Sequence, residues 1–518
     1  MNRPDQVARF RGHARPWDVI VIGGGATGVG IAVDAASRGY DVLLVEQHDF
    51  GKGTSSRSTK LVHGGVRYLE QGNISLVMEA LKERGRLRQN APHLVTNLAF
   101  GVPNYAWWEA PFYGLGLKVY NVLAGKYGFG TSEVLSREET LARLPTIKTE
   151  GLRGGVVYYD GQFDDARLLI NLAATAVEQG ATLLNYTQVV GLLKGDDGFV
   201  DGVIVRDVED GDERPARARV VINATGPFAD QVRRMADPSV SKLIAPSQGI
   251  HLVFDRSFLP GDSAIMVPHT RDGRVMFAIP WHGHTLVGTT DTPIDEPSPE
   301  PRALASEIDF ILETAGQYLH TPPTRADVLS IFVGIRPLVR SGDSRMTAAL
   351  SRDHTIHIDA SGLLTTTGGK WTTYRRMAED TVDQAADLAR LPERPCVTRD
   401  LNIHGFHRHA STFGSLAAYG SDAVEIQHLM REDPTLATPL HAALPYTGAE
   451  VVWATREELA RTVEDVLARR TRALFLNARA AVAMAPAVAA LMAPMLGRDD
   501  AWPREQVRAF TELAQQYR

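Results

Sequence analysis

The stretch from Trp17 to Gln47 constrains the fold more than any other part of the chain. It begins with a β-branched apolar run, residues 19–22, that is typical of a buried parallel strand. Three glycines follow in G-x-G-x-x-G spacing, and a helical pattern then runs to about Ser37. A second apolar run, residues 42–45, ends at Glu46. This order of strand, glycines, helix, strand and acid predicts a βαβ unit that binds a dinucleotide.

The glycines and the acid have separate roles in such a unit. Gly23 permits the tight turn, Gly25 lets a pyrophosphate approach the backbone, and Gly28 lets the helix pack closely on the strand. The helix N-terminus offers unpaired N–H groups to the phosphates. Glu46 stands where an acid binds ribose hydroxyls, whereas an arginine would have indicated a 2′-phosphate. The alternative is an ordinary βαβ turn without a nucleotide.

Length and charge limit the classes of function. A chain of 518 residues is too long for one hydrophobic core, so we expect two or three domains. The net charge of −6 gives no general attraction to nucleic acid, and no nucleic-acid partner is expected. Any anionic substrate must therefore be held by local cations. No group of His, Cys and Asp has metal-ligand spacing, so no metal is expected.

The single cysteine, Cys396, excludes a disulfide within the chain and any C-x-x-C redox pair. This removes the disulfide-reductase branch of dinucleotide-binding enzymes and fits a reducing compartment. The first sixteen residues contain no apolar core segment, so we expect no secretory signal there. Since the chain has one dinucleotide fingerprint, the dinucleotide is expected to be the redox centre itself. This favours FAD over an exchanging NAD.

Several later segments predict further architecture. Strands and turns from 249 to 290 predict an antiparallel sheet, and the chain beyond about 400 is mostly helical. In that tail, residues 455–458 resemble a capping box that starts a helix. The uncharged run 480–497 is interrupted by two prolines and is interpreted as a buried or edge pair of helices rather than a membrane span. The aromatic stretch 105–130 fits either a membrane interface or a surface for domain packing.

Cations and histidines in loops are the candidates for substrate chemistry. Arg67, Arg336 and Lys370 each stand beside glycine or an aromatic residue, and each bond to a phosphate contributes roughly 1.5–3 kcal/mol. The alternative is three unrelated surface ion pairs. His63 and His251 could each accept a hydroxyl proton, although a structural role is as good an interpretation for either one. By contrast, four cations in the helical pattern from 75 to 89 are interpreted as a solvated face: Lys82, Arg84, Arg86 and Arg88.

Three further loops contain small residues that permit ligand contacts. The loop after Glu46 is rich in glycine and hydroxyl groups and is expected to contact the ligand. The strand that ends in "NATG" lets a ligand approach its backbone, and the glycine pair before Lys370 predicts a second anion site at a helix start. The residues that we select from these loops are Thr54, Ser55, Ser58, Ala224, Gly226, Gly369 and Thr372.

Taken together, these motifs resemble the FAD-dependent glycerol-3-phosphate dehydrogenases. The matching stretches are "DVIVIGGGATGVGIAVDAASRG", "GTSSRSTKLVHGGVRYLE", "DDARL", "VINATGPFAD", "GIRPL", "SRDHTIHID", "GGKWTTYR" and, in the tail, "VEDVLARRTRALFLNARAA". The resemblance covers nearly the whole chain and is weakest over 102–155 and 401–443. It implies an α/β fold: a glutathione-reductase-like FAD-binding domain (15–100, 150–245 and 351–395), an antiparallel-sheet substrate domain (101–149 and 246–350) and a C-terminal helical domain (401–518).

The resemblance also implies an activity and a site. The activity is oxidation of sn-glycerol 3-phosphate to dihydroxyacetone phosphate, with electrons passed to a membrane quinone by a cytoplasmic enzyme bound peripherally to the inner face of the membrane. Around the substrate phosphate the resemblance places Arg67, Tyr68, Arg336 and Lys370. Near the flavin and the substrate hydroxyl it places His63, His251 and Arg352. An oxidase, a non-catalytic flavin sensor and a homodimer formed through the helical tail remain open alternatives.

Overall fold

The computed structural model describes residues 1–518 except 66–72, 269, 271–272 and 341–353. In these residues the dinucleotide-type sheet has the strand order β17-β18-β10-β1-β2-β7. The strand that opens the chain, β1, pairs in parallel with β10 and β2, as predicted. The bounds along this order are His354–Ile358, Leu364–Gly368, Glu213–Asn223, Trp17–Ile22, Val42–Val45 and Thr182–Leu184; β8 (Thr187–Lys194) and β9 (Val200–Asp207) extend the sheet from β10.

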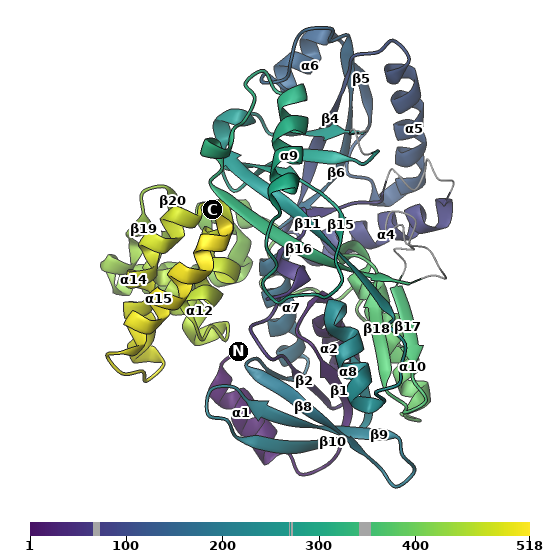
Figure 1. Cartoon of the computed structure of the whole chain (residues 1–518), viewed down its shortest axis with the longest axis vertical. Coiled ribbons are helices and arrows are strands. Elements are labelled where there is room, and N and C mark those ends of the chain that lie inside the picture. The colour runs from purple at the N-terminus through teal and green to yellow at the C-terminus, as the bar shows by residue number, and fades with distance from the viewer. Residues whose placement is uncertain (66–72, 269, 271–272, 341–353) are drawn as a thin grey trace.

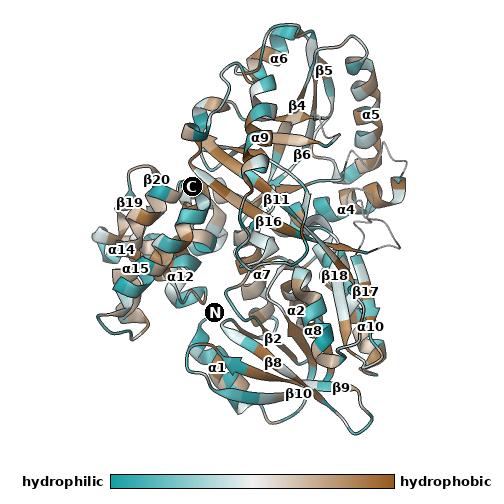
Figure 2. Ribbon diagram, viewed as in Figure 1, coloured by the Kyte–Doolittle hydropathy of each residue, from teal (hydrophilic) through white to brown (hydrophobic). Residues whose placement is uncertain are grey.

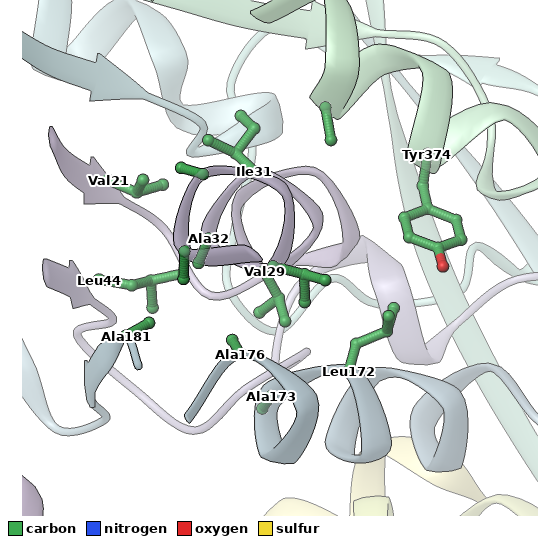
Figure 3. Packing of buried hydrophobic residues seen from close by; sticks show 14 of the residues in the cluster. Val21, Val29, Ile31, Ala32, Leu44, Leu172, Ala173, Ala176, Ala181 and Tyr374 are labelled. Carbon is green, nitrogen blue, oxygen red and sulfur yellow. The ribbon is translucent and has the colours of Figure 1, made fainter. Parts of the chain in front are cut away.

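Helix α2 (Ala26–Ser37) is the central packing element of this domain. Val29, Ile31 and Ala32 are fully buried, and Figure 3 shows them between the strand residues Val21 and Leu44 and the neighbouring helices. Those helices are α7 (Asp165–Glu178) and α10 (Tyr374–Leu388). Two further helices, α1 (Arg3–Gly12) and α8 (Ala229–Ala236), lie at the periphery of the domain (Figure 1). This packing fixes the N-terminus of α2 at the carboxyl end of β1.

The second sheet confirms the predicted antiparallel architecture. Its strand order is β15-β11-β14-β13-β12-β4-β6-β3, and β16 pairs with β11 over ten residues. The bounds along this order are Thr292–Pro293, Ile244–Asp255, His284–Gly288, Met276–Trp281, Ser263–Val267, Val95–Asn104, Gly154–Phe163 and Leu61–Val62; β16 is Ser330–Val339 and β5 is Glu133–Leu135. Its helices are α4 (Ile74–Asn90), α5 (Glu109–Ala124), α6 (Arg137–Arg143) and α9 (Ala305–Tyr318).

The C-terminal part is a separate helical layer beside both sheets (Figure 1), so the predicted fold class is confirmed. Within the described residues, α14 (Ala478–Met495) is the one helix long and apolar enough to cross a membrane, and half of it is buried in the protein. The expectation of two helices here was wrong, because both prolines lie inside one continuous helix. The other helices of this layer are α11 (Ala423–Glu432), α12 (Gly448–Glu457), α13 (Ala473–Leu476) and α15 (Trp502–Ala514), with a hairpin of β19 (Pro439–His441) and β20 (Leu444–Thr447).

Two local predictions were wrong because tertiary contacts decide them. The capping box that starts α12 is formed by Thr447 and Glu450, whereas Thr455 lies in the last turn of that helix. On α4, Arg84 is not solvated: its side chain is 1 % exposed and donates a hydrogen bond to Asp160 of β6.

A buried ion network joins the helical layer to the dinucleotide domain. Arg469 and Arg470 both donate to Asp49, and their charges outweigh its burial, so the pKa of this carboxyl is lowered. Arg167 of α7 pairs with Glu458 at the end of α12. Since an unpaired buried charge is costly, these contacts fix how the two parts sit against one another.

Candidate active site

The glycine turn after β1 has no room for side chains. Gly23 has φ +111, and a Cβ there would lie 2.7 Å from the carbonyl oxygen of Ala224. A Cβ on Gly28 would lie 1.9 Å from the carbonyl oxygen of Gly23. Gly25 caps α2 without a side chain, so no side-chain cap covers the helix N-terminus at the adjoining cavity. This is the geometry of a pyrophosphate site.

A large cavity runs along this turn and unites residues from seven separate segments. Nine predicted residues line it: Gly23, Gly25, Glu46, Thr54, Ser55, Ala224, Gly226, Gly369 and Lys370. Sequence reasoning missed the wall formed by Gln188 and Val189 of β8, and also Trp371 and Tyr374. The β8 residues carry no local signal, because a long-range contact brings them beside Glu46: the N–H of Thr187 donates to the carbonyl oxygen of Glu46 at 2.8 Å.

Glu46 holds the turn at the end of β2. Its carboxylate accepts hydrogen bonds from the backbone N–H of Gly24 at 2.7 Å and of His48 at 2.8 Å. Burial raises the pKa of this carboxyl in spite of both bonds. Each carboxylate oxygen can accept a further bond, so Glu46 can still take a ribose hydroxyl as predicted.

The hydroxyl-rich loop contains residues that line the cavity and others that bond to the protein interior. Ser55 accepts from the N–H of Ala26 at 2.9 Å, and Thr54 donates to the carbonyl oxygen of Ile335 on β16. Ser58, although predicted as a cofactor contact, is not among the lining residues. Its N–H and hydroxyl both donate to Asp165, at 3.0 and 2.7 Å. It therefore stabilises the loop from behind.

The opposite wall carries a glycine pair and one of the predicted cations. Gly369 has φ +70, Lys370 lines the cavity, and Trp371 donates its indole N–H to the carbonyl of Ser55 at 2.8 Å. Thr372 lies behind this wall, where its hydroxyl accepts from the N–H of His63 at 3.2 Å. The structure thus joins the segment of Lys370 to that of His63.

His251 lies on β11, buried beside the cavity rather than in its lining. Its Nε2 is 2.9 Å from the hydroxyl of Thr59, and its ring stacks on Phe332. Burial, together with the charges of Lys60 and Arg336, lowers the pKa of His251 well below its usual value. The imidazole is therefore neutral near pH 7.

Arg336 of β16 forms part of an arginine–aspartate–arginine group. It donates to Asp291 at 3.1 Å and to the carbonyl oxygen of Thr290 at 2.9 Å. Arg274 reaches the other oxygen of the same carboxylate at 3.7 Å. Arg336 is followed directly by Pro337, which lines the cavity. Sequence reasoning missed Arg274.

Lys60 and Asp165 form a buried pair beneath the site. The ammonium is 2.7 Å from the carboxylate, and neither side chain is exposed. This contact gives Asp165 a structural role. The predicted residues Arg67, Tyr68 and Arg352 lie outside the described residues.

Comparison with known proteins places this geometry in a family. Residues 18–375 match the family model "FAD dependent oxidoreductase", and residues 367–502 match "C-terminal domain of alpha-glycerophosphate oxidase". The human protein "Glycerol-3-phosphate dehydrogenase, mitochondrial" is 41 % identical over 95 % of this chain and 72 % of its own length. The Arabidopsis thaliana protein "Glycerol-3-phosphate dehydrogenase SDP6, mitochondrial" is 40 % identical over 97 % and 86 %. The chain belongs to the FAD-dependent glycerol-3-phosphate dehydrogenase family.

A solved structure supports the same assignment for the fold and the cofactor. The glycerol-3-phosphate dehydrogenase from Bacillus halodurans, complexed with FAD, superposes with a TM-score of 0.80. It is 30 % identical and covers 99 % of this chain and 97 % of its own. The cofactor of this protein is FAD, as predicted. The cradle formed by the glycine turn, Glu46 and Ser55 fits a dinucleotide.

Proposed function

We propose that this enzyme oxidises sn-glycerol 3-phosphate to dihydroxyacetone phosphate and passes the electrons to a membrane quinone. One observation carries the proposal. The cavity that contains the dinucleotide turn also contains Lys370, and β16 brings the Arg336–Asp291 group to its edge. A doubly negative phosphate needs more than one cation to offset its desolvation. A neutral polyol would gain nothing from them.

The protein residues orient the substrate and move its proton. Bound FAD supplies the hydride acceptor for C2. Lys370 and Arg336 bind the phosphate, which directs C2 toward the cofactor and lowers the entropic part of the barrier. His251 takes the C2 hydroxyl proton on its neutral ring, with His63 as the alternative base. The family resemblance adds Arg67 and Tyr68 at the phosphate and Arg352 at the developing alkoxide.

The electron acceptor and the location are part of the same proposal. A quinone dissolves in the bilayer, so an enzyme that reduces it must work at the membrane surface. We place this enzyme on the cytoplasmic side of that membrane, bound peripherally. Oxygen is the alternative acceptor: the structurally similar L-alpha-glycerophosphate oxidase of Mycoplasma pneumoniae, 18 % identical at a TM-score of 0.56, shares the fold.

The variant Arg336→Ala tests the proposal. We expect it to retain flavin while kcat/KM for glycerol 3-phosphate falls at least about tenfold, because a charge-assisted bond is lost. Arg206→Ala, at an exposed position on β9 of the other sheet, is the matched control. Unchanged kinetics would refute the phosphate site. Hydrogen peroxide in proportion to substrate, undiminished by a soluble quinone, would instead favour the oxidase.

A further inference from the structure

Helix α5 exposes an apolar face to the outside of the protein. Phe112, Leu115, Val119 and Val122 recur at helical spacing, and Leu115 and Val122 are 68 % and 80 % exposed. The opposite face, with Tyr113, Leu117 and Tyr120, is already buried against the protein. A helix on the surface of a soluble domain normally turns a polar face outward, so an apolar outer face is unusual here. Figure 2 shows the brown residues of α5 at the outer edge of the molecule.

Exposed apolar side chains gather around this helix. In the described part of the chain, 17 large apolar side chains are exposed, and nine of them belong to one region. These nine are Ile74, Met78, Trp107, Trp108, Phe112, Leu115, Val119, Val122 and Val134. They come from α4, β5, α5 and the turn before it, and α5 contacts both α4 and β5. An apolar gathering of this kind marks an interaction surface, whereas single exposed residues do not.

A basic hollow adjoins the apolar face at the end of α5. It is lined by Arg86, Arg88, Lys126 and Arg399, with Asp400 as the one carboxylate among the lining residues that the structure describes. Lys126 follows α5 directly and is exposed, and Lys118 flanks the apolar face on the helix itself. Two of the arginines also pair with the buried carboxylates Glu83 and Glu379. Positive charge therefore exceeds negative charge along this edge.

We propose that the outer face of α5 and the adjoining basic hollow dock on an anionic phospholipid bilayer. This inference rests on the proposed quinone-linked function and names the surface that would meet the membrane. The apolar side chains enter the acyl boundary, the two tryptophans lie at headgroup level, and the cations meet lipid phosphates. A convex helix with exposed lysines at its flank fits a fluid surface better than the groove of a protein partner.

The position of α5 relative to the site agrees with this arrangement. On its inner face, the hydroxyl of Tyr120 accepts from the N–H of Gly64 at 2.8 Å and donates to Asp160 at 2.8 Å. Gly64 follows His63, whose segment joins the wall of Lys370. A membrane that covers the outer face of α5 is thus separated from the segment of His63 by the thickness of one helix. A lipid-soluble acceptor would have a short route to the site.

Co-sedimentation of the FAD-loaded enzyme with vesicles tests the surface. We expect binding to phosphatidylcholine vesicles that contain phosphatidylglycerol and about tenfold weaker binding to phosphatidylcholine alone. Leu115→Ser/Val122→Ser should weaken binding to both by about tenfold or more. Lys118→Glu/Lys126→Glu should remove the preference for phosphatidylglycerol. The matched control, Phe199→Ser/Val208→Ser, changes two exposed apolar residues elsewhere and should bind as the wild type does.

The proposal would be overturned if the Leu115/Val122 variant bound vesicles as strongly as the wild type does. The proposal would also fail if the wild-type enzyme did not bind vesicles but self-associated, and if the Leu115/Val122 variant no longer did so. The face of α5 would then be an interface between copies of the chain. Flavin absorbance and anaerobic reduction by glycerol 3-phosphate must stay unchanged in every variant, which shows that the fold is intact. Vesicle binding without reduction by this substrate in the wild type would refute the proposed function and leave the docking surface standing.

Discussion

The ammonium of Lys60 lies 2.7 Å from the carboxylate of Asp165, and both side chains are fully buried. The same lysine also donates to the carbonyl oxygen of Ser56, and the same aspartate accepts from Ser58. The pair thereby ties α7 to the loop that lines the cavity. It lies beneath the aromatic rings of Trp281, Phe332 and Phe475, which leave no water to solvate a lone charge.

Removing one partner of this pair should therefore be strongly destabilising. We expect Asp165→Asn to lower the free energy of unfolding by about 3–5 kcal/mol, because the lysine charge stays buried without compensation. Urea unfolding followed by flavin release measures it. The double variant Lys60→Met/Asp165→Leu should lose less than the single one, and an equal or greater loss would contradict the explanation by charge.

Glu46 should contribute to cofactor affinity. In Glu46→Gln an amide N–H would face the backbone N–H of Gly24 or His48, where a carboxylate oxygen now accepts. We expect the Kd for FAD to rise about tenfold or more, since a charge-assisted hydrogen bond is lost. Fluorescence titration of deflavinated protein measures this Kd. Glu213→Gln, at an exposed position, is the control, and an unaltered affinity in Glu46→Gln would contradict the role of Glu46.

His251 should act through kcat rather than through substrate binding. We expect His251→Asn to lower kcat by about 10²–10⁴-fold with a smaller change in KM. Because its pKa lies well below the usual value, kcat of the wild type should not fall through protonation of this residue as pH drops from neutral toward 6.5. Steady-state kinetics across pH measure both. A larger effect of His63→Asn would move the base to that residue.

His404 should make stability depend on pH. Its two ring nitrogens face Glu178 at 2.5 Å and Asp422 at 2.8 Å, and these carboxylates outweigh burial and raise its pKa from 6.5 to about 9. The stabilisation is complete below the unfolded value of 6.5 and is lost as pH rises through about 9. Since Glu178 is half exposed, we expect about 1–2 kcal/mol. Urea unfolding of the wild type and of His404→Gln across this pH range measures the free energy of unfolding. If the two proteins showed parallel dependence of this free energy on pH, the role of His404 would be contradicted.

The sequence predicted the elements that local chemistry decides. The glycine turn, both strands beside it and α2 follow from spacing, because Gly23 and Gly28 have no room for a Cβ. Arg84 was mispredicted since its partner, Asp160, is 76 residues away. The wall from β8 could not be predicted, because a backbone hydrogen bond from Thr187 to the distant Glu46 places it there. The group of Arg274, Asp291 and Arg336 could not be predicted either, because residues far apart in the sequence form it.

The same contrast between local sequence and long-range contacts applies to the roles of the site residues. Lys370, Thr54 and Ser55 line the cavity, since loops at strand ends converge there, and their roles toward ligands stay predictions. Motifs could not separate these residues from Ser58 and Thr372, which have the same chemistry. In the structure Ser58 donates to Asp165 and Thr372 accepts from the backbone N–H of His63, which distinguishes these two hydroxyls from those that line the cavity.

Anaerobic titration of the purified flavoprotein with polyol phosphates tests the central claim most directly. We predict that glycerol 3-phosphate bleaches the flavin absorbance fully, whereas unphosphorylated glycerol at equal concentration leaves it oxidised. Equal bleaching by glycerol, or a flavin that stays oxidised with every phosphorylated polyol, would contradict the account.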